Sequence, residues 1–107
     1  MDASLPGTVN LVAYRGDTWA QQFRFLFDAI PLDLTGATVA SWAENGRSYP
    51  LVVELDPVPT TGQLTLKLPA SLPPGQFRYD VEVTDAGGEV TTWVRGLLNV
   101  YADVTNA

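Results

Sequence analysis

The segment 76–101 constrains how this chain can fold more than any other. It contains two stretches in which apolar and polar residues alternate, QFRYDVEVT and EVTTWVRGLLNVY, on either side of Asp85-Ala86-Gly87-Gly88. A period of two places successive side chains on opposite faces of a strand, and a glycine-rich turn lets the chain reverse its direction. The pattern therefore predicts an antiparallel β-hairpin with one buried face and one exposed face.

The turn predicts a register for this hairpin. With Thr84 opposite Glu89, one face carries an apolar set that we assign to the core: Phe77, Tyr79, Val81 and Val83, opposite Gly96, Val94, Thr92 and Val90. The other face carries Arg78, Asp80, Glu82, Thr91, Trp93 and Arg95. This second face is polar except for one large tryptophan. A tryptophan on the solvent side of a sheet indicates a binding surface.

The rest of the chain predicts five more strands. They occupy residues 8–14, 18–27, 37–44, 47–56 and 63–68. Together with the hairpin they make about seven strands, which is typical of an immunoglobulin-like antiparallel β-sandwich. We therefore expect an all-β fold with an N-terminal arm over residues 1–7, a sandwich domain over 8–103 and a C-terminal tail over 104–107.

Composition argues against several kinds of site. The 107 residues are enough for one domain, and they include no cysteine and no histidine. The chain therefore lacks thiolate metal ligands, disulfides and the commonest general base. A net charge of -6 disfavours nucleic-acid binding, which needs a concentrated positive surface. We expect no catalytic residue, no bound metal and no cofactor.

No segment predicts insertion into a membrane. The chain has no run that approaches the roughly 20 apolar residues of a membrane-spanning helix. Its opening sequence, MDASLPGTVNL, lacks the basic start and the hydrophobic stretch of a signal peptide. We take Met1 as the start of the translation product.

Asp80 and Glu82 stand two residues apart on one face of the predicted hairpin. Paired carboxylates carry out glycoside hydrolysis in many enzymes. Arg78 lies beside Asp80, however, and Arg95 lies on the neighbouring strand. We therefore favour a ladder of surface salt bridges, each contributing roughly 0–1 kcal/mol. No apolar pocket that would raise the pKa of either carboxyl group is evident.

The aromatic residues divide into core and surface candidates. The strand phases assign six of them to the core: Trp19, Phe23, Phe25, Phe27, Phe77 and Tyr79. Trp42 falls out of phase with Val39, Ser41 and Ala43, so its side chain is expected to point outward, as that of Trp93 does.

Two outward tryptophans on different strands can form one patch. We predict a protein interface made by these tryptophans and two neighbouring arginines: Trp42, Arg78, Trp93 and Arg95. Two alternatives stay open. The tryptophans could stack on sugar rings, or residues 1–7 or 69–75 of the same chain could cover one of them.

Several motifs resemble those of small virion proteins of tailed bacteriophages. An RGD-T-aromatic turn precedes a strand, and a P-hydrophobic-D-L-T-G segment follows. A G-x-aromatic-x-Y-D strand then leads into a T-D-x-x-G hairpin and a closing G-x-hydrophobic-x-V. The matching residues are 15–19, 31–36, 75–80, 84–88 and 96–100. Nearly the whole chain is similar to the immunoglobulin-like module at the N-terminus of phage baseplate upper and minor tail proteins.

The resemblance implies a non-enzymatic structural subunit of the virion, a minor tail or baseplate protein that is made in the bacterial cytoplasm and docks to other virion proteins. The usual symmetry of virions predicts a homo-oligomer, such as a trimer. Neither nucleic acid nor a membrane is an expected partner. No coiled coil or receptor-binding part follows the module in this sequence, so a capsid decoration protein of the same fold is the first alternative. A carbohydrate- or host-surface-binding module is the second.

Overall fold

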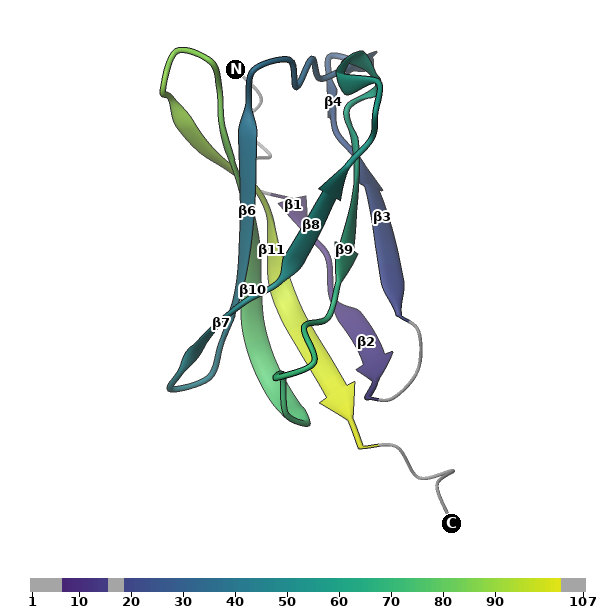
Figure 1. The fold of residues 1–107 in the computed structure, drawn as a ribbon, viewed down its shortest axis with the longest axis vertical. Helices are drawn as coiled ribbons and strands as arrows, with labels where there is room; N and C mark the ends of the chain where they lie inside the picture. Colours follow the sequence, from purple (N-terminus) through teal and green to yellow (C-terminus); the bar gives the residue numbers. More distant parts are fainter. Residues whose placement is uncertain (1–6, 16–18, 103–107) are drawn as a thin grey trace.

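Two β-sheets stacked on each other make up the protein (Figure 1). The computed structural model describes residues 7–15 and 19–102. The large sheet contains β1 (Gly7–Thr8), β2 (Leu11–Tyr14), β6 (Thr38–Glu44), β7 (Ser48–Pro50), β10 (Gly75–Thr84) and β11 (Val90–Tyr101). Its order is β1-β11-β10-β6-β7, and β2 also pairs with β11. The small sheet has the order β3-β9-β8, made by β3 (Ala20–Arg24), β9 (Gln63–Lys67) and β8 (Val52–Leu55).

Two short elements lie at one end of the sandwich (Figure 1). β4 (Leu26–Phe27) pairs with β5 (Ile30–Pro31), and the single turn of 3-10 helix η1 (Pro59–Thr61) lies beside them. The backbone N–H of Leu34 donates to the carbonyl of Pro59 at 3.0 Å and connects the two segments. In the described part of the chain, no helix has the length and apolar character needed to cross a membrane.

The expected all-β sandwich is confirmed, with one correction to its strand directions. β1 and β2 run parallel to β11, whereas every other strand pair within 7–15 and 19–102 is antiparallel. The predicted strand 8–14 is thus two short strands that both lie along β11. Gly7, which we assigned to the arm, is paired in β1. Residues 1–6 of the arm and the tail 104–107 lie outside the described residues.

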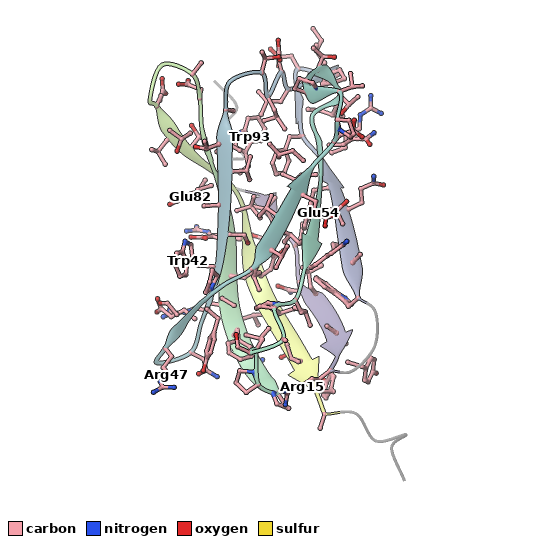
Figure 2. All side chains as sticks on the ribbon, viewed as in Figure 1. Arg15, Trp42, Arg47, Glu54, Glu82 and Trp93 are labelled. Carbon is pink, nitrogen blue, oxygen red and sulfur yellow. The ribbon has the colours of Figure 1, made fainter. Side chains whose placement is uncertain are left out.

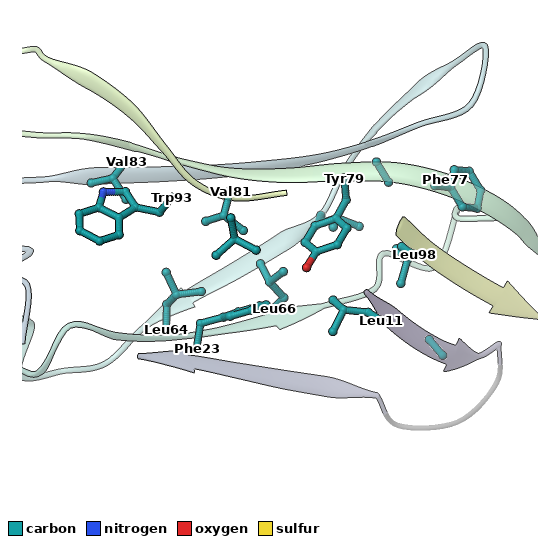
Figure 3. Packing of buried hydrophobic residues seen from close by; sticks show 14 of the residues in the cluster. Leu11, Phe23, Leu64, Leu66, Phe77, Tyr79, Val81, Val83, Trp93 and Leu98 are labelled. Carbon is teal, nitrogen blue, oxygen red and sulfur yellow. The ribbon is translucent and has the colours of Figure 1, made fainter. Parts of the chain in front are cut away.

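The core fills the space between the two sheets (Figure 3). The residues of β10 alternate as predicted, with Phe77, Tyr79, Val81 and Val83 buried. The small sheet contributes its own buried set, which includes Phe23, Leu64 and Leu66. Of the other predicted core aromatics, Phe25 is buried, Trp19 is half-buried against the core, and the side chain of Phe27 lies outside the described part.

The register of the β10–β11 hairpin differs from the prediction near the turn. Thr84 pairs with Val90 instead of Glu89, because Glu89 belongs to the loop. The N–H of Glu89 donates to the Asp85 carboxylate at 2.9 Å, which closes the loop one residue later than expected. A slip of one residue exchanges the two faces of a strand. The two threonines that follow Val90 therefore exchange faces relative to the prediction.

A β-bulge in β11 then re-aims Trp93. Val81 pairs with Val94 and Glu82 with Thr92, which leaves Trp93 as an extra residue between the two pairs. An extra residue bends the strand and changes where its side chain points. Trp93 and Val94 are consequently both buried, with 9% and 6% of their surface exposed. The prediction that Trp93 points outward is wrong.

The segment between β1 and β2 crosses β11 at Gly96. A Cβ atom at Gly96 would lie only 2.1 Å from the carbonyl oxygen of Val9, so only glycine leaves room for this crossing. The same oxygen accepts a hydrogen bond from the Tyr79 hydroxyl at 2.6 Å. The N–H of Val9 donates to the carbonyl of Arg95 at 3.0 Å. A buried tyrosine on β10 thus holds the two parallel strands against the sheet.

We expect Tyr79→Phe to lower the free energy of unfolding by about 1–2 kcal/mol at neutral pH, because the Val9 carbonyl loses its donor. Burial raises the pKa of the Tyr79 hydroxyl to about 12, from an ordinary value of 10.0. As the pH rises between these two values, the unfolded chain loses this proton before the folded chain does, so stability falls. Urea unfolding of both proteins across this pH range tests the prediction. A variant with an unchanged alkaline decline would contradict it.

Candidate functional site

The outer face of the large sheet, which points away from the small sheet, carries most of the predicted site residues. The strand pairing puts Trp42 on β6 opposite Asp80 on β10, Asp80 opposite Arg95 on β11, and Arg95 beside Thr8 on β1. These four residues form one row across four strands. Neighbouring strands lie about 4.8 Å apart, so the row is roughly 14 Å long.

A broad hollow of about 840 Å³ lies over this row, and we call it the outer hollow. Its walls include six residues from four strands: Thr8, Trp42, Glu44, Arg78, Asp80 and Arg95. Three of the four predicted interface residues therefore meet here. The fourth, Trp93, lies in the core and does not line the hollow.

Trp42 is the large aromatic residue of this face. Figure 2 shows its side chain on the side of β6 away from the small sheet, whereas Trp93 lies between the sheets. The exposed fraction of Trp42 is 46%. The buried neighbours Ser41 and Ala43 face the core, as expected from the alternation along β6. The predicted outward orientation of Trp42 is confirmed.

The two arginines of the hollow differ in their partners. Arg78 is exposed and forms an ion pair with Glu44, with its Nη2 3.4 Å from Oε1. An exposed pair of this kind contributes roughly 0–1 kcal/mol. Arg95 is exposed as well, and it has no ion pair within the described residues. Both guanidinium groups remain available to a bound molecule.

Asp80 sits at the middle of the row with an unmet hydrogen-bonding group. Its Oδ1 atom is buried and has no partner among the described residues. Burial raises the pKa of the Asp80 carboxyl group, and the nearby charge of Glu82 raises it further. A hydrogen bond from the backbone N–H of Trp42 opposes this rise, and the charge of Glu44 adds to it. A bound donor at Oδ1 would remove an unfavourable burial.

A second aromatic feature extends the outer face along β11. Tyr14 on β2 stacks on Tyr101 with ring centroids 5.5 Å apart, and both side chains are about half exposed. Leu97 lies on the same face between this stack and Arg95. Sequence reasoning missed the stack, because it requires β2 to lie parallel to β11. The outer hollow thus continues into an apolar surface.

The described residues provide groups for binding, not for holding a metal. No cluster of three acidic side chains that could hold a metal ion occurs among residues 7–15 and 19–102. The predicted salt-bridge ladder is only partly present, because Arg78 pairs with Glu44 on β6 instead of Asp80. The face therefore combines an exposed indole, a free guanidinium and an unmet carboxylate.

The comparisons with known proteins concern the fold. No protein-family model matches this chain, and no curated protein sequence matches it. Among solved structures, an SrpA adhesin mutant from Streptococcus sanguinis aligns with a TM-score of 0.51 and 17% identity, over 91% of this chain and 57% of that chain. An internalin-like protein of Listeria monocytogenes aligns with a TM-score of 0.48 and 13% identity, over 88% of this chain and 27% of that chain. The likeness to the adhesin supports the β-sandwich fold alone.

Proposed function

We propose that this chain is a non-enzymatic structural subunit of a tailed-bacteriophage virion, located in the minor tail or baseplate. It acts by docking to neighbouring virion proteins through the outer face of the large sheet. The phage assignment rests on the motifs at 15–19, 31–36, 75–80, 84–88 and 96–100. The docking role rests on the outer hollow, where Trp42 is exposed beside two arginines.

One observation carries the docking role. A tryptophan with 46% of its surface exposed lies next to a buried carboxylate oxygen that has no partner in the described part of the chain. Tryptophan and arginine are the residue types that most often dominate protein interfaces, and a desolvated tryptophan anchor contributes about 2–4 kcal/mol. Arg78 and Arg95 then provide donors around this anchor.

The test is to locate the protein in purified virions from the source. Mass spectrometry should detect the chain, and immunogold labelling should place it on the tail. Label over the head would instead support the capsid decoration alternative. Virions that contain none of the chain would contradict a structural role in the particle.

We expect Trp42→Ala to reduce incorporation of the chain into virions by at least about 10-fold while leaving the monomer folded, because the anchor of the interface is removed. Quantitative mass spectrometry of virions assembled with the variant measures the effect. Leu55→Ala is the matched control, since Leu55 is an exposed apolar residue on the small sheet. Equal incorporation of the two variants would rule out Trp42 as the anchor.

A carbohydrate-binding module is the second candidate function. Trp42 offers an exposed indole beside charged hydrogen-bonding groups, an arrangement that also suits a sugar ring. Titration with host-surface glycans, monitored by tryptophan fluorescence, distinguishes the two functions. A saturable shift that disappears in Trp42→Ala would favour sugar binding over protein docking.

A further inference from the structure

Two opposite charges at the centre of the outer hollow lack partners among the described residues. Asp80 and Arg95 are directly opposite each other on β10 and β11. No ion pair joins them, and the buried Oδ1 of Asp80 accepts no hydrogen bond. On the small sheet, by contrast, Lys67 and Glu54 pair with each other at 3.0 Å. The outer face thus leaves unmet what the small sheet satisfies within one chain.

We propose that the occupant of the outer hollow is the same face of a second copy of this chain. The two copies are related by a two-fold axis that passes between Asp80 and Arg95. This inference rests on the proposed docking role of the face. Rotation by half a turn sets Asp80 of each copy against Arg95 of the other, so both groups gain a partner of opposite charge. Because the same patch is used on both sides, the contact closes as a dimer.

The ends of the row fit the same axis. β6 lies next to β10 on one side of the axis, and β1 lies next to β11 on the other. Trp42 and Thr8 are therefore equally distant from it, and the rotation carries Trp42 of one copy over Thr8 of the other. Thr8 is a small exposed residue, which leaves room for an indole. Each tryptophan is then covered by the partner copy.

The overall charge makes the association depend on these local contacts. Each copy carries a net charge of -6, so two copies repel each other at long range. The attraction must come from the two Asp80–Arg95 pairs and the two tryptophans. A dimer of this kind also replaces the trimer that virion symmetry suggested, because an isologous contact joins two copies and not three.

Sedimentation velocity of the purified full chain, from low to high micromolar concentration, tests the proposal. The unaltered protein should sediment as a reversible dimer. Asp80→Arg and Arg95→Asp should each weaken association by about 100-fold, because each places like charges against one another in two contacts. The double variant Asp80→Arg with Arg95→Asp should associate within about 10-fold of the unaltered protein, since the reversed pair is again self-complementary.

Matched controls separate this effect from net charge and from folding. Glu54→Arg and Lys67→Asp make the same charge changes on the small sheet and should leave the dimer unchanged. Circular dichroism establishes that each variant is folded. If a charge reversal unfolds the chain, Asp80→Asn and Arg95→Gln take its place, and each should weaken association by about 10-fold.

Three results would overturn the inference: a monomer at every concentration, a particle with the mass of three chains, or a double variant that associates as poorly as the single reversals. Its failure is distinguishable from failure of the proposed function. Virions that contain the chain, together with a monomeric purified protein, would overturn the dimer alone. A reversible dimer of a chain that is absent from virions would overturn the virion role alone.

Discussion

Trp93→Ala is expected to lower the free energy of unfolding by about 3–5 kcal/mol, the range for removal of a large aromatic side chain from a core. Trp93 is 9% exposed and stacks on Phe25, with ring centroids 5.3 Å apart and the planes inclined by 17°. Figure 3 shows its indole among buried residues of the large and small sheets. Removing it leaves a cavity between the sheets that the surrounding β-structure can fill only in part.

Urea unfolding followed by circular dichroism measures this loss. Trp42→Ala is the matched control, because Trp42 is exposed on the outer face and its removal should change the free energy of unfolding by less than about 0.5 kcal/mol. Trp93→Phe should lie between the two, since phenylalanine retains part of the ring contact with Phe25. If Trp93→Ala were as stable as the unaltered protein, Trp93 would be a surface residue and the bulge in β11 would be misplaced.

Gly96→Ala is expected to lower the free energy of unfolding by about 2–3 kcal/mol, because the added methyl group collides with backbone atoms that cannot move independently. Its Cβ would lie 2.1 Å from the carbonyl oxygen of Val9 and 2.8 Å from the carbonyl carbon. Moving Val9 away breaks its hydrogen bond with Tyr79 and the one that it donates to Arg95. The substitution should therefore detach the segment between β1 and β2 from the sheet.

Amide hydrogen exchange locates this damage. We expect faster exchange at Val9 and at Leu97, whose N–H donates to Oδ1 of Asn10 at 3.0 Å. Gly7→Ala is the control, since a Cβ there has only an ordinary contact of 3.7 Å with the carbonyl of Trp93. The Gly96 variant should also bind its partner less well, because Thr8 leaves the wall of the outer hollow. Unchanged stability and exchange would contradict the crossing at Gly96.

Strand β10 shows how far an alternating pattern can be trusted. Its residues from Phe77 to Val83 have the predicted faces, because an unbroken period of two together with one buried face allows a single orientation. β11 begins with the same kind of pattern, but Trp93 and Val94 are adjacent apolar residues. That adjacency is the one signal in the sequence for a bulge. Alternation alone could not place it, because a bulge is defined by the pairing with the neighbouring strand.

The predicted return strand 47–56 shows a different limit. Its apolar residues are in phase, but the chain leaves the large sheet after β7 and enters the small sheet as β8. Leu51 is the buried residue at this crossing, and its N–H donates to the carbonyl of Ser41 at 2.8 Å. Both halves keep the expected extended conformation. Which sheet each half joins depends on the core that the two sheets share.

The sequence by itself determined the all-β class, the core face of β10 and the outward direction of Trp42, because each follows from the periodicity of residues along one strand. Only the tertiary structure decided that Trp93 is buried, that β1 and β2 run parallel to β11, and that Trp42, Asp80, Arg95 and Thr8 form one row. Side-chain direction within a strand depends on neighbouring residues in the chain. The pairing of strands distant in the sequence depends instead on the packing of the whole core, which no short segment encodes.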